Sequence, residues 1–458
     1  MSKQKAQIVV CGAGIAGISA AYHLAVKQGV RDVVLVDERE PLTLTSDKST
    51  ECYRNWWPGP GDTMVRFMNH SIDLLGELAD GSGNYFNMNQ RGYIFLTADA
   101  EKAQSMQQAA AEIAALGAGK LRVAQTVVDY APSPDEGYDL TRDGADMLLD
   151  SDMIQAHYPF INDEAQALLH ARRCGWLSAQ QLGMYMLEQA KAHGARLIQG
   201  RVSNVVVENG RIRAVEIDQN GDKTQIATPT YVIAAGPLVK PAAAMIGVDL
   251  PVFNELHGKI AFEDTQGVIP RDVPLMIWND PVHLAWTDEE REELAAYEDT
   301  RWLVEEFPAG VHFRPEGGPG AQTVLAIWTY DVDVLEPTWP VNLPDEYAEI
   351  IMRGLVRMVP GLEVYLGKMA RPYIDGGYYC KTQENRPLIG PLPIDGAYII
   401  GALSGYGIMA AMASGELLAA HVTGDTLPDY APDFLLSRYD DPAYQAMLAD
   451  WDPTTGQL

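Results

Sequence analysis

Residues 8–24, which read IVVCGAGIAGISAAYHL, combine a short apolar run, three spaced glycines and an alanine-rich continuation. Because residues 8–10 are apolar and β-branched, we expect a buried strand there, with a helix over residues 18–24. Gly12, Gly14 and Gly17 form the pattern G-x-G-x-x-G. The first glycine permits a tight turn, the second lets the backbone approach a pyrophosphate, and the third lets the helix pack closely on the strand. The stretch therefore predicts a dinucleotide site that directs phosphate to a helix N-terminus.

A second apolar run, residues 33–36, ends in Asp37 and Glu38. A carboxylate at this interval after the glycines binds the ribose hydroxyls of a dinucleotide. A lone glycine pattern also occurs in ordinary turns, but a strand, glycines, a helix, a strand and an acid in this order favour the cofactor. We expect Ile15 and Ala16, which lie between the glycines, to contact the same cofactor.

The composition is that of an ordinary globular protein. The chain has 458 residues, of which 47% are hydrophobic and 21% charged, and this length predicts two domains. The 34 basic and 62 acidic residues give a net charge of −28, which disfavours nucleic acid and anionic membranes as partners. The excess acid either forms a solvated face or steers cationic amine substrates towards the protein.

The four cysteines, Cys11, Cys52, Cys174 and Cys380, lack the spacing of a metal site or a redox pair. We therefore expect no metal and a reducing compartment. The N-terminal residues run directly into the first strand without a signal sequence, which predicts a cytoplasmic protein. Residues 399–415 are apolar, but they are rich in glycine and short for a bilayer, so we expect them to be buried in the protein rather than to span a membrane.

A polar loop follows the second strand, where residues 46–57 read SDKSTECYRNWW. Lys48, Ser49, Thr50 and Arg54 supply hydroxyls and cations in succession, as the ribityl chain and diphosphate of FAD require. The alternative is a capping loop, because serine and threonine also begin helices.

The remaining chain alternates helices and strands. The periodicity predicts helices over residues 62–78, 98–116, 180–193 and 346–358. It predicts strands over 92–96, 194–198 and 230–237, and a hairpin of 202–208 with 212–218 joined by Asn209-Gly210. Further strands are expected over 259–263, 274–278, 283–286, 311–314 and 323–330. The stretch that ends at residue 150 is acidic and reads as irregular.

A second strand, glycine turn and helix lies near the C-terminus. Residues 397–401 form the expected strand, Ser404-Gly405-Tyr406-Gly407 form the turn, and the helix runs over 408–421 and ends at Gly424. Its positive end suits the electron-rich pyrimidine edge of a reduced flavin. The small residues Ala235 and Gly236 end the strand over 230–237 and would let the backbone approach the cofactor from the opposite side.

Four separated segments together resemble one family. They are GAGIAG at 12–17 with Asp37, the loop from Ser49 to Arg54, AAG at 234–236, and GALSGYG at 401–407. In these motifs the chain resembles the FAD-dependent oxidoreductases of the D-amino acid oxidase superfamily, which includes glycine oxidase, sarcosine oxidase and dimethylglycine dehydrogenase. Residues 312–318, HFRPEGG, also resemble a strand of the substrate domain in the dimethylglycine dehydrogenase branch.

The resemblance implies an α/β fold with a discontinuous Rossmann-like FAD-binding domain and a mixed, mostly antiparallel β substrate domain. We assign residues 1–82, 150–245 and 365–435 to the first domain, 83–149 and 246–364 to the second, and 436–458 to a C-terminal tail.

The resemblance also implies where FAD lies. The three glycines of the first motif and Ser49-Thr50 would follow the diphosphate and ribityl chain, Asp37 with Glu38 the ribose, and Val202 the adenine. The turn residues Gly405, Tyr406, Gly407, Ile408 and Met409 would surround the isoalloxazine. Cys380 is out of register for covalent attachment, so we expect non-covalent FAD.

The implied reaction takes a hydride from a carbon bearing an amine onto flavin N5, and the resulting imine hydrolyses. The substrate is an amino acid or another primary or secondary amine, and oxygen or another acceptor receives the electrons. One alternative is an FAD-dependent dehydrogenase of a 2-hydroxy acid or polyol phosphate. Another is a flavin-binding subunit without turnover.

Four residues are candidates for the chemistry. Arg371, in an Arg-Pro pair, would bind a substrate carboxylate, although a surface ion pair is as common. His257 is either a base in the pocket or a structural histidine. Lys259 would replace the lysine that assists oxygen reduction in sarcosine oxidase, or is solvated. Tyr378 would supply an aromatic wall or a hydroxyl donor, although tyrosines at strand spacing are more often core residues.

Overall fold

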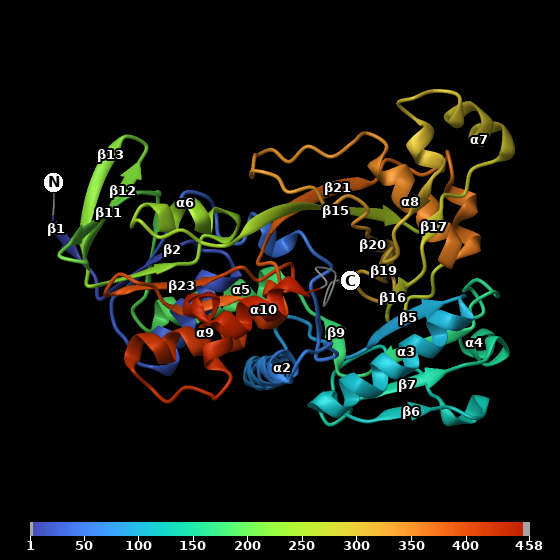
Figure 1. The fold of residues 1–458 in the computed structure, drawn as a ribbon, viewed down its shortest axis with the longest axis horizontal. Coiled ribbons are helices and arrows are strands. Elements are labelled where there is room, and N and C mark those ends of the chain that lie inside the picture. The colour runs from blue at the N-terminus through green and yellow to red at the C-terminus, as the bar shows by residue number, and fades with distance from the viewer. Residues whose placement is uncertain (1–2, 452–458) are drawn as a thin grey trace.

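The computed structural model describes residues 3–451 and contains three principal β-sheets (Figure 1). The part of the predicted tail at 452–458 lies outside the described residues. The structure is mixed α/β, as predicted.

A six-stranded sheet carries the dinucleotide motif. Its strand order is β10-β3-β2-β14-β23-β22, and all neighbours are parallel except β22 and β23. The strands are β2 (Ile8–Cys11), β3 (Val33–Asp37), β10 (Arg196–Gln199), β14 (Thr230–Ile233), β22 (Leu388–Pro391) and β23 (Ala397–Gly401). Because these strands come from the beginning, middle and end of the chain, this sheet is discontinuous in sequence.

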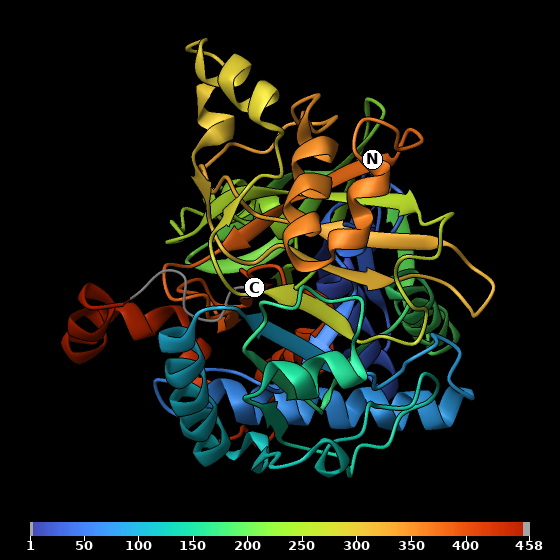
Figure 2. The same cartoon turned by 90° about the vertical axis from the view of Figure 1, so that its right-hand side faces the viewer.

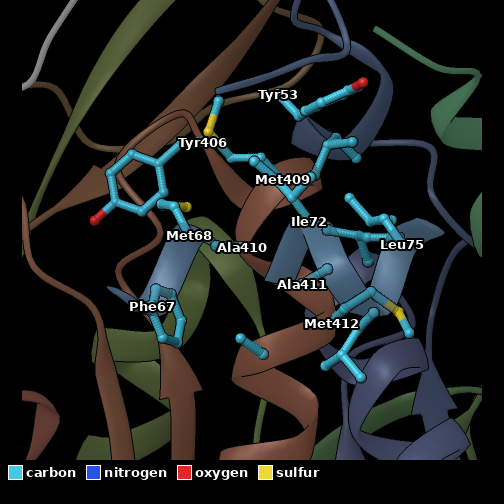
Figure 3. Packing of buried hydrophobic residues seen from close by; sticks show 14 of the residues in the cluster. Tyr53, Phe67, Met68, Ile72, Leu75, Tyr406, Met409, Ala410, Ala411 and Met412 are labelled. Atoms are coloured by element: carbon cyan, nitrogen blue, oxygen red, sulfur yellow. The ribbon is translucent and has the colours of Figure 1, made fainter. Parts of the chain in front are cut away.

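Helices α1 (Ile15–Tyr22), α2 (Thr63–Ser82), α5 (Ala179–Ala192) and α9 (Gly407–Thr423) cover this sheet, with α6 (Val239–Ala244) at its other side. Helices α1 and α9 approach closely because Gly415 has no side chain, and a Cβ there would lie 2.2 Å from Ser19 Oγ. The Ser19 hydroxyl donates to the Ala411 carbonyl at 2.6 Å. Figure 3 shows α2 and α9 in contact through side chains that include Ile72 and Met412.

A four-stranded sheet adjoins the first, in the order β1-β13-β12-β11. Its strands are β1 (Lys3–Lys5), β11 (Arg201–Glu208), β12 (Arg211–Gln219) and β13 (Asp222–Ala227). The predicted hairpin is confirmed, because β11 pairs with β12 and the turn residues Asn209 and Gly210 have φ of 53° and 72°. Two positive φ angles match the turn that an Asn-Gly pair favours.

A nine-stranded sheet forms the other half of the molecule (Figure 1), in the order β21-β15-β20-β19-β16-β5-β8-β7-β6. Its strands are β5 (Tyr93–Thr97), β6 (Leu121–Val123), β7 (Ala145–Leu148), β8 (Ala167–Ala171), β15 (Phe253–Glu263), β16 (Leu275–Trp278), β19 (His312–Pro315), β20 (Thr323–Ile327) and β21 (Tyr373–Lys381). Only β16 with β5 and β6 with β7 are parallel among its described pairs, so the sheet is mostly antiparallel, as predicted.

The remaining elements lie outside the three principal sheets. They are α3 (Ala100–Ile113), α4 (Ser151–His157), α7 (Asp288–Ala295), α8 (Tyr347–Met358), α10 (Pro442–Ala449), the strand pair β4 (Cys52–Arg54) and β9 (Cys174–Trp176), and the short pair β17 (Val282–His283) and β18 (Glu306–Phe307). Helix α7, in which five of the first six residues, 288–293, are acidic, projects at the outer end of this half (Figure 2). None of its residues is buried, which agrees with a solvated face.

Three details of the predicted organisation differ from the structure. The stretch before residue 150 is not wholly irregular, because it contains β6 and β7. Strands β8 and β21 fall in ranges assigned to the FAD-binding domain, yet they belong to the nine-stranded sheet. Backbone pairing places both strands in that sheet, β8 beside β5 and β21 beside β15. Such pairing between distant segments cannot be predicted from the local sequence. The strand expected at 283–286 is reduced to β17.

Within residues 3–451, no helix is both long and apolar enough to cross a bilayer. The apolar residues 399–415 instead form the end of β23, the second glycine turn and the first half of α9.

The C-terminal segment is docked by a buried ion pair. Arg438 donates through Nε and Nη2 to Glu384 Oε1 at 3.0 and 2.7 Å, and both side chains are at most 3% exposed. Tyr439 and Tyr444 donate to the same carboxylate oxygen at 2.8 and 3.0 Å. This pair joins the segment after β23 to the loop that precedes β22.

We predict that Arg438→Met lowers the free energy of unfolding by about 3–5 kcal/mol, because it leaves the Glu384 carboxylate buried without its cation. The measurement is urea unfolding followed by tryptophan fluorescence. Arg211→Ala is the control, since it removes an ion pair with Asp395 whose side chains are 58% and 60% exposed, and we expect a change below about 1 kcal/mol. Equal effects of the two variants would contradict the prediction.

Candidate functional site

An elongated cavity of about 360 Å³ lies between the two glycine turns. Its wall comes from the ends of β2, β3, β14, β21 and β23 and from the first residues of α1 and α9. Of the residues predicted to contact the cofactor, the cavity is lined by Gly12, Gly14, Ile15, Ala16, Asp37, Glu38, Ser49, Val202, Ala235, Gly236, Gly405, Gly407 and Ile408. The structure therefore brings distant parts of the chain together at one cavity.

The first glycine turn leaves no room for side chains at two of its glycines. Gly12 has φ of +113°, and a Cβ there would lie 2.3 Å from the Ala234 carbonyl oxygen. A Cβ at Gly17 would lie 2.0 Å from the Gly12 carbonyl oxygen. Gly17 does not line the cavity, so its role is the close packing of α1 on β2. The backbone N–H of Ile15 donates to Ser46 Oγ at 3.0 Å, which places a hydroxyl beside the N-terminus of α1.

Two acids end β3 and face the cavity differently. Asp37 Oδ2 accepts from the Ala13 N–H at 2.7 Å, and Asp37 Oδ1 accepts from the Arg39 N–H at 2.9 Å. Asp37 thus braces the glycine turn, while its remaining lone pairs are able to accept from a ribose hydroxyl. Glu38 is exposed and also lines the cavity.

The second glycine turn is shaped by Tyr379. Gly405 has φ of +84°, and a Cβ there would lie 2.4 Å from Cδ2 of the Tyr379 ring. Helix α9 begins directly after this turn, and its N-cap residue, Tyr406, makes no side-chain capping hydrogen bond within the described chain. The positive end of α9 is therefore directed at the cavity without a protein side chain to cap it.

A smaller cavity of about 90 Å³ adjoins the first. The two share Ser49, Tyr379, Ser404, Gly405 and Ile408 in their walls. Its other lining residues are Thr50, Cys52, Arg54, Trp57, Tyr93, His257, His312, Ile327, Thr329, Lys381, Tyr406 and Met409. Thr50, Tyr406 and Met409, predicted to contact the cofactor, thus face this second cavity.

Arg54 is the buried guanidinium in the smaller cavity. The sequence placed it among the cofactor contacts, but it does not line the larger cavity. It is 5% exposed, and its guanidinium carbon lies 4.5 Å from the centroid of the Trp57 ring. The pairing of β4 with β9 holds it there. A planar cation in a small cavity is suited to a carboxylate.

His257 lies in the same cavity within a buried polar network. Its Nε2 is 3.2 Å from Glu255 Oε2, its Nδ1 is 2.8 Å from Thr329 Oγ1, and its ring stacks on Tyr379 with centroids 4.0 Å apart. Lys381 Nζ donates to Glu255 Oε2 at 2.8 Å. Burial lowers the pKa of His257, so its imidazole is neutral at pH 7. Burial also lowers the pKa of His312, to about 4.

Besides Gly17, three predicted residues line neither of these two cavities. Arg371 is exposed and precedes β21, so the structure gives no support to it as a carboxylate partner. Lys259 is buried, and its ammonium donates to the carbonyls of Asp47 at 2.8 Å and Ser49 at 3.3 Å. These hydrogen bonds join β15 to the polar loop of residues 46–57. Lys48 lies between Asp47 at 3.0 Å and Asp375 at 2.7 Å, so its charge is used in ion pairs.

Tyr378 lines the larger cavity rather than the smaller one. Its hydroxyl lies 3.2 Å from Thr338 Oγ1, and its ring meets Trp339 edge-on. The adjacent Tyr379 faces both cavities and is the better candidate for the aromatic wall. Cys380 also lines the larger cavity, where burial raises the pKa of its thiol to about 12, so the thiol is un-ionised.

Sequence reasoning missed Glu255, His312, Thr329 and Lys381. Each lies in or beside a strand of the nine-stranded sheet, and each reads as an ordinary strand residue. Alternation along residues 253–263 offered one signal, because Glu255, His257 and Lys259 share one side of β15. Their partners on β21 follow only from pairing across more than 100 residues.

The larger cavity fits FAD. Its wall includes the acids of β3, the first glycine turn and the N-terminus of α9, so it offers a ribose partner, a phosphate-binding helix end and a second helix end. A dinucleotide cavity that opens onto a small buried cavity defines the class of protein as a flavin-dependent oxidoreductase.

The sequence model of the DAO family, described as FAD dependent oxidoreductase, matches residues 7–421, and the chain belongs to this family. Its cofactor is therefore FAD.

Relatives known by sequence are distant. Mitochondrial dimethylglycine dehydrogenase of Homo sapiens is 24% identical over 282 residues, which cover 60% of this chain and 28% of the human protein. The uncharacterised oxidoreductase YurR of Bacillus subtilis is 24% identical over 271 residues, which cover 56% of this chain and 63% of that protein. The chain thus matches less than a third of the length of the human dehydrogenase.

Solved structures share the fold over nearly the whole chain. L-proline dehydrogenase from P. horikoshii has a TM-score of 0.72 at 20% identity and covers 96% of this chain and 98% of its own. Glycine oxidase from Geobacillus kaustophilus has a TM-score of 0.71 at 15% identity, covering 95% and 99%. Iminodiacetate oxidase from Chelativorans sp. BNC1 has a TM-score of 0.68 at 17% identity, covering 94% and 98%.

We predict that Gly405→Ala weakens FAD binding at least about tenfold, because a side chain at a positive φ would be strained and would displace Tyr379 from the wall of both cavities. The measurement is titration of the apoprotein with FAD, followed by quenching of flavin fluorescence. Gly424→Ala is the matched control, since Gly424 has φ of +76° with nothing within 4 Å of the added Cβ. The prediction is wrong if both variants bind FAD alike.

Proposed function

We propose that the protein oxidises a small amino acid or a related amine that carries a carboxylate, at the carbon bearing nitrogen. The observation that carries this proposal is Arg54, a buried guanidinium that lines the small cavity beside the cofactor cavity. A buried cation lined by aromatic rings favours an anionic ligand group, and a carboxylate matches its planar donors.

The protein's own residues would orient the substrate. FAD, when bound, would be the acceptor of a hydride from the substrate carbon. Arg54 would hold the carboxylate, while Tyr379 and Trp57 would enclose the apolar part and exclude water. The neutral His257 would face the amine, which must lose its proton before its lone pair assists the departure of hydride. Holding the reacting carbon in one position supplies much of the rate.

The cavity and the comparisons support a small substrate. A volume of about 90 Å³ suits a compact amino acid better than one with a long side chain. Structural neighbours include proteins described as glycine oxidase, L-proline dehydrogenase and iminodiacetate oxidase. Identities of 20% or less carry the fold and not the substrate, so the choice among small amines depends on the cavity itself.

The two alternatives make different demands on the same cavity. A 2-hydroxy acid also has a carboxylate for Arg54, and its hydroxyl proton also needs a base. A flavin-binding subunit without turnover would have its substrate space filled by side chains. Trp57 and Met409 do contribute to the wall, but a cavity remains beside them, which favours an enzyme.

The test is anaerobic reduction of the FAD-loaded protein by a panel of compounds. Glycine, sarcosine, N,N-dimethylglycine and L-proline represent amines, and lactate, 2-hydroxyglutarate and glycerol 3-phosphate represent the alternative. We expect one or more of the amines to bleach the flavin absorbance. Bleaching by a hydroxy compound alone would replace the proposal with the first alternative, and bleaching by none would favour the second.

We predict that Arg54→Lys raises the apparent dissociation constant of the active amino acid at least about 30-fold, equivalent to 2 kcal/mol or more, because the bidentate partner of a buried carboxylate is lost. The measurement is the substrate dependence of anaerobic flavin reduction. Arg371→Gln is the control, since Arg371 is exposed and lines neither cavity. If Arg371→Gln has the larger effect, the carboxylate lies elsewhere.

A further inference from the structure

Three buried side chains and the half-buried Thr329 form a continuous hydrogen-bonded chain behind and within the smaller cavity. Lys381 Nζ and His257 Nε2 both contact Glu255 Oε2, at 2.8 and 3.2 Å, and His257 Nδ1 contacts Thr329 Oγ1 at 2.8 Å. Lys381, His257 and Thr329 line the cavity, and Glu255 lies behind them. Lys381, Glu255 and His257 are 2%, 6% and 7% exposed, so water does not compete strongly for these contacts.

The donors and acceptors in this chain have a single consistent direction. An ionised carboxylate only accepts hydrogen bonds, so His257 donates through Nε2 and, being neutral, accepts through Nδ1. The hydroxyl of Thr329 must then donate to Nδ1. Since a hydroxyl has one proton and two lone pairs, Thr329 has only acceptor capacity left for a molecule in the cavity.

The ionisation of Glu255 keeps this direction fixed. Burial raises the pKa of the Glu255 carboxyl, but hydrogen bonds from His257 and Lys381 outweigh it and hold the pKa below its usual value. Lys381 is therefore a positioning residue, because it acts on the cavity through Glu255 and His257.

We propose that Thr329, backed by His257, Glu255 and Lys381, is the group that accepts the proton of the substrate nitrogen. This inference rests on the proposed function and deepens it, because it assigns the residues that convert the bound ammonium to the free amine. The N–H bond of the substrate breaks as Thr329 Oγ1 takes its proton, and Thr329 passes its own proton to His257 Nδ1. The net result is a neutral amine and an imidazolium ion beside the Glu255 carboxylate.

The groups that face His257 are consistent with this role. Burial disfavours the imidazolium most, Glu255 favours it, and Lys381 on β21 disfavours it. His312 on β19, whose pKa burial lowers to about 4, is neutral at pH 7 and adds no charge. Tyr379 stacks on the ring, and Arg54 lines the same cavity.

The first experiment measures the pH dependence of anaerobic flavin reduction in the FAD-loaded protein at saturating L-proline, sarcosine or glycine. In the wild type the imidazole keeps the proton inside the cavity only below the pKa that His257 has in the complex, so we expect a rate that is constant with pH in that range. In His257→Gln the amine must lose its proton to water first. We expect the rate of this variant to fall about tenfold for each pH unit that the pH is lowered through the same range, and to match the wild type above it.

Two substitutions at Thr329 separate the hydroxyl from the packing. Thr329→Val removes the acceptor, and we expect it to give the same pH profile as His257→Gln. Thr329→Ser keeps the hydroxyl and should restore the flat profile of the wild type. A flat profile in both His257→Gln and Thr329→Val would overturn the proposal.

The second experiment does not depend on turnover. The ¹⁵N NMR shifts of the His257 ring, assigned by their absence in His257→Gln, report which nitrogen carries the proton in the FAD-loaded protein without substrate. We expect the proton on Nε2. In the double variant Glu255→Gln/Lys381→Met, which removes both charges together, that preference should be lost. A proton on Nδ1 in the wild type would overturn the relay, even if no amine reduced the flavin and the proposed function failed separately.

Discussion

Two buried cations of the nine-stranded sheet hold the loop on which both cavities depend. Lys259 on β15 binds the carbonyls of Asp47 and Ser49, and Arg314 on β19, with a fully buried side chain, donates to the Thr50 carbonyl at 2.5 Å and pairs with Glu316. Carbonyl oxygens buried at such a loop need donors. Because these donors come from the nine-stranded sheet, the position of the loop beside the cofactor cavity depends on that sheet.

The two cavities differ in the residues that line them. The larger one is lined in large part by glycine and other small residues at the ends of strands and helices. The smaller one is built from side chains on β4, β15 and β21 and from Thr329 just beyond β20. Strand β15 also carries Lys259, which holds the loop of residues 46–57, and β21 carries Tyr379, which lines both cavities, so the two cavities share structural support.

The sequence predicted well what neighbouring residues decide. The glycine turn, the acid after β3, the Asn-Gly hairpin and the helix that ends at Gly424 follow from steric and hydrogen-bonding rules acting over a few residues. It failed where a role depends on pairing between distant strands. Arg371 has a guanidinium suited to a substrate carboxylate, but it is exposed. Lys259 has the charge expected of a lysine beside the flavin, but its ammonium donates to loop carbonyls. Lys381 gave no local signal, because only the pairing of β21 with β15 brings it to Glu255.

The strand order of the six-stranded sheet also bears on how the chain is made. Strand β14 lies between β2, near the beginning of the chain, and β23, near its end, and the wall of the larger cavity includes residues 12 and 408. During synthesis on a ribosome, the first glycine turn emerges long before the second exists. The cofactor cavity is therefore completed only after α9 has left the exit tunnel, so the first glycine turn alone does not enclose FAD.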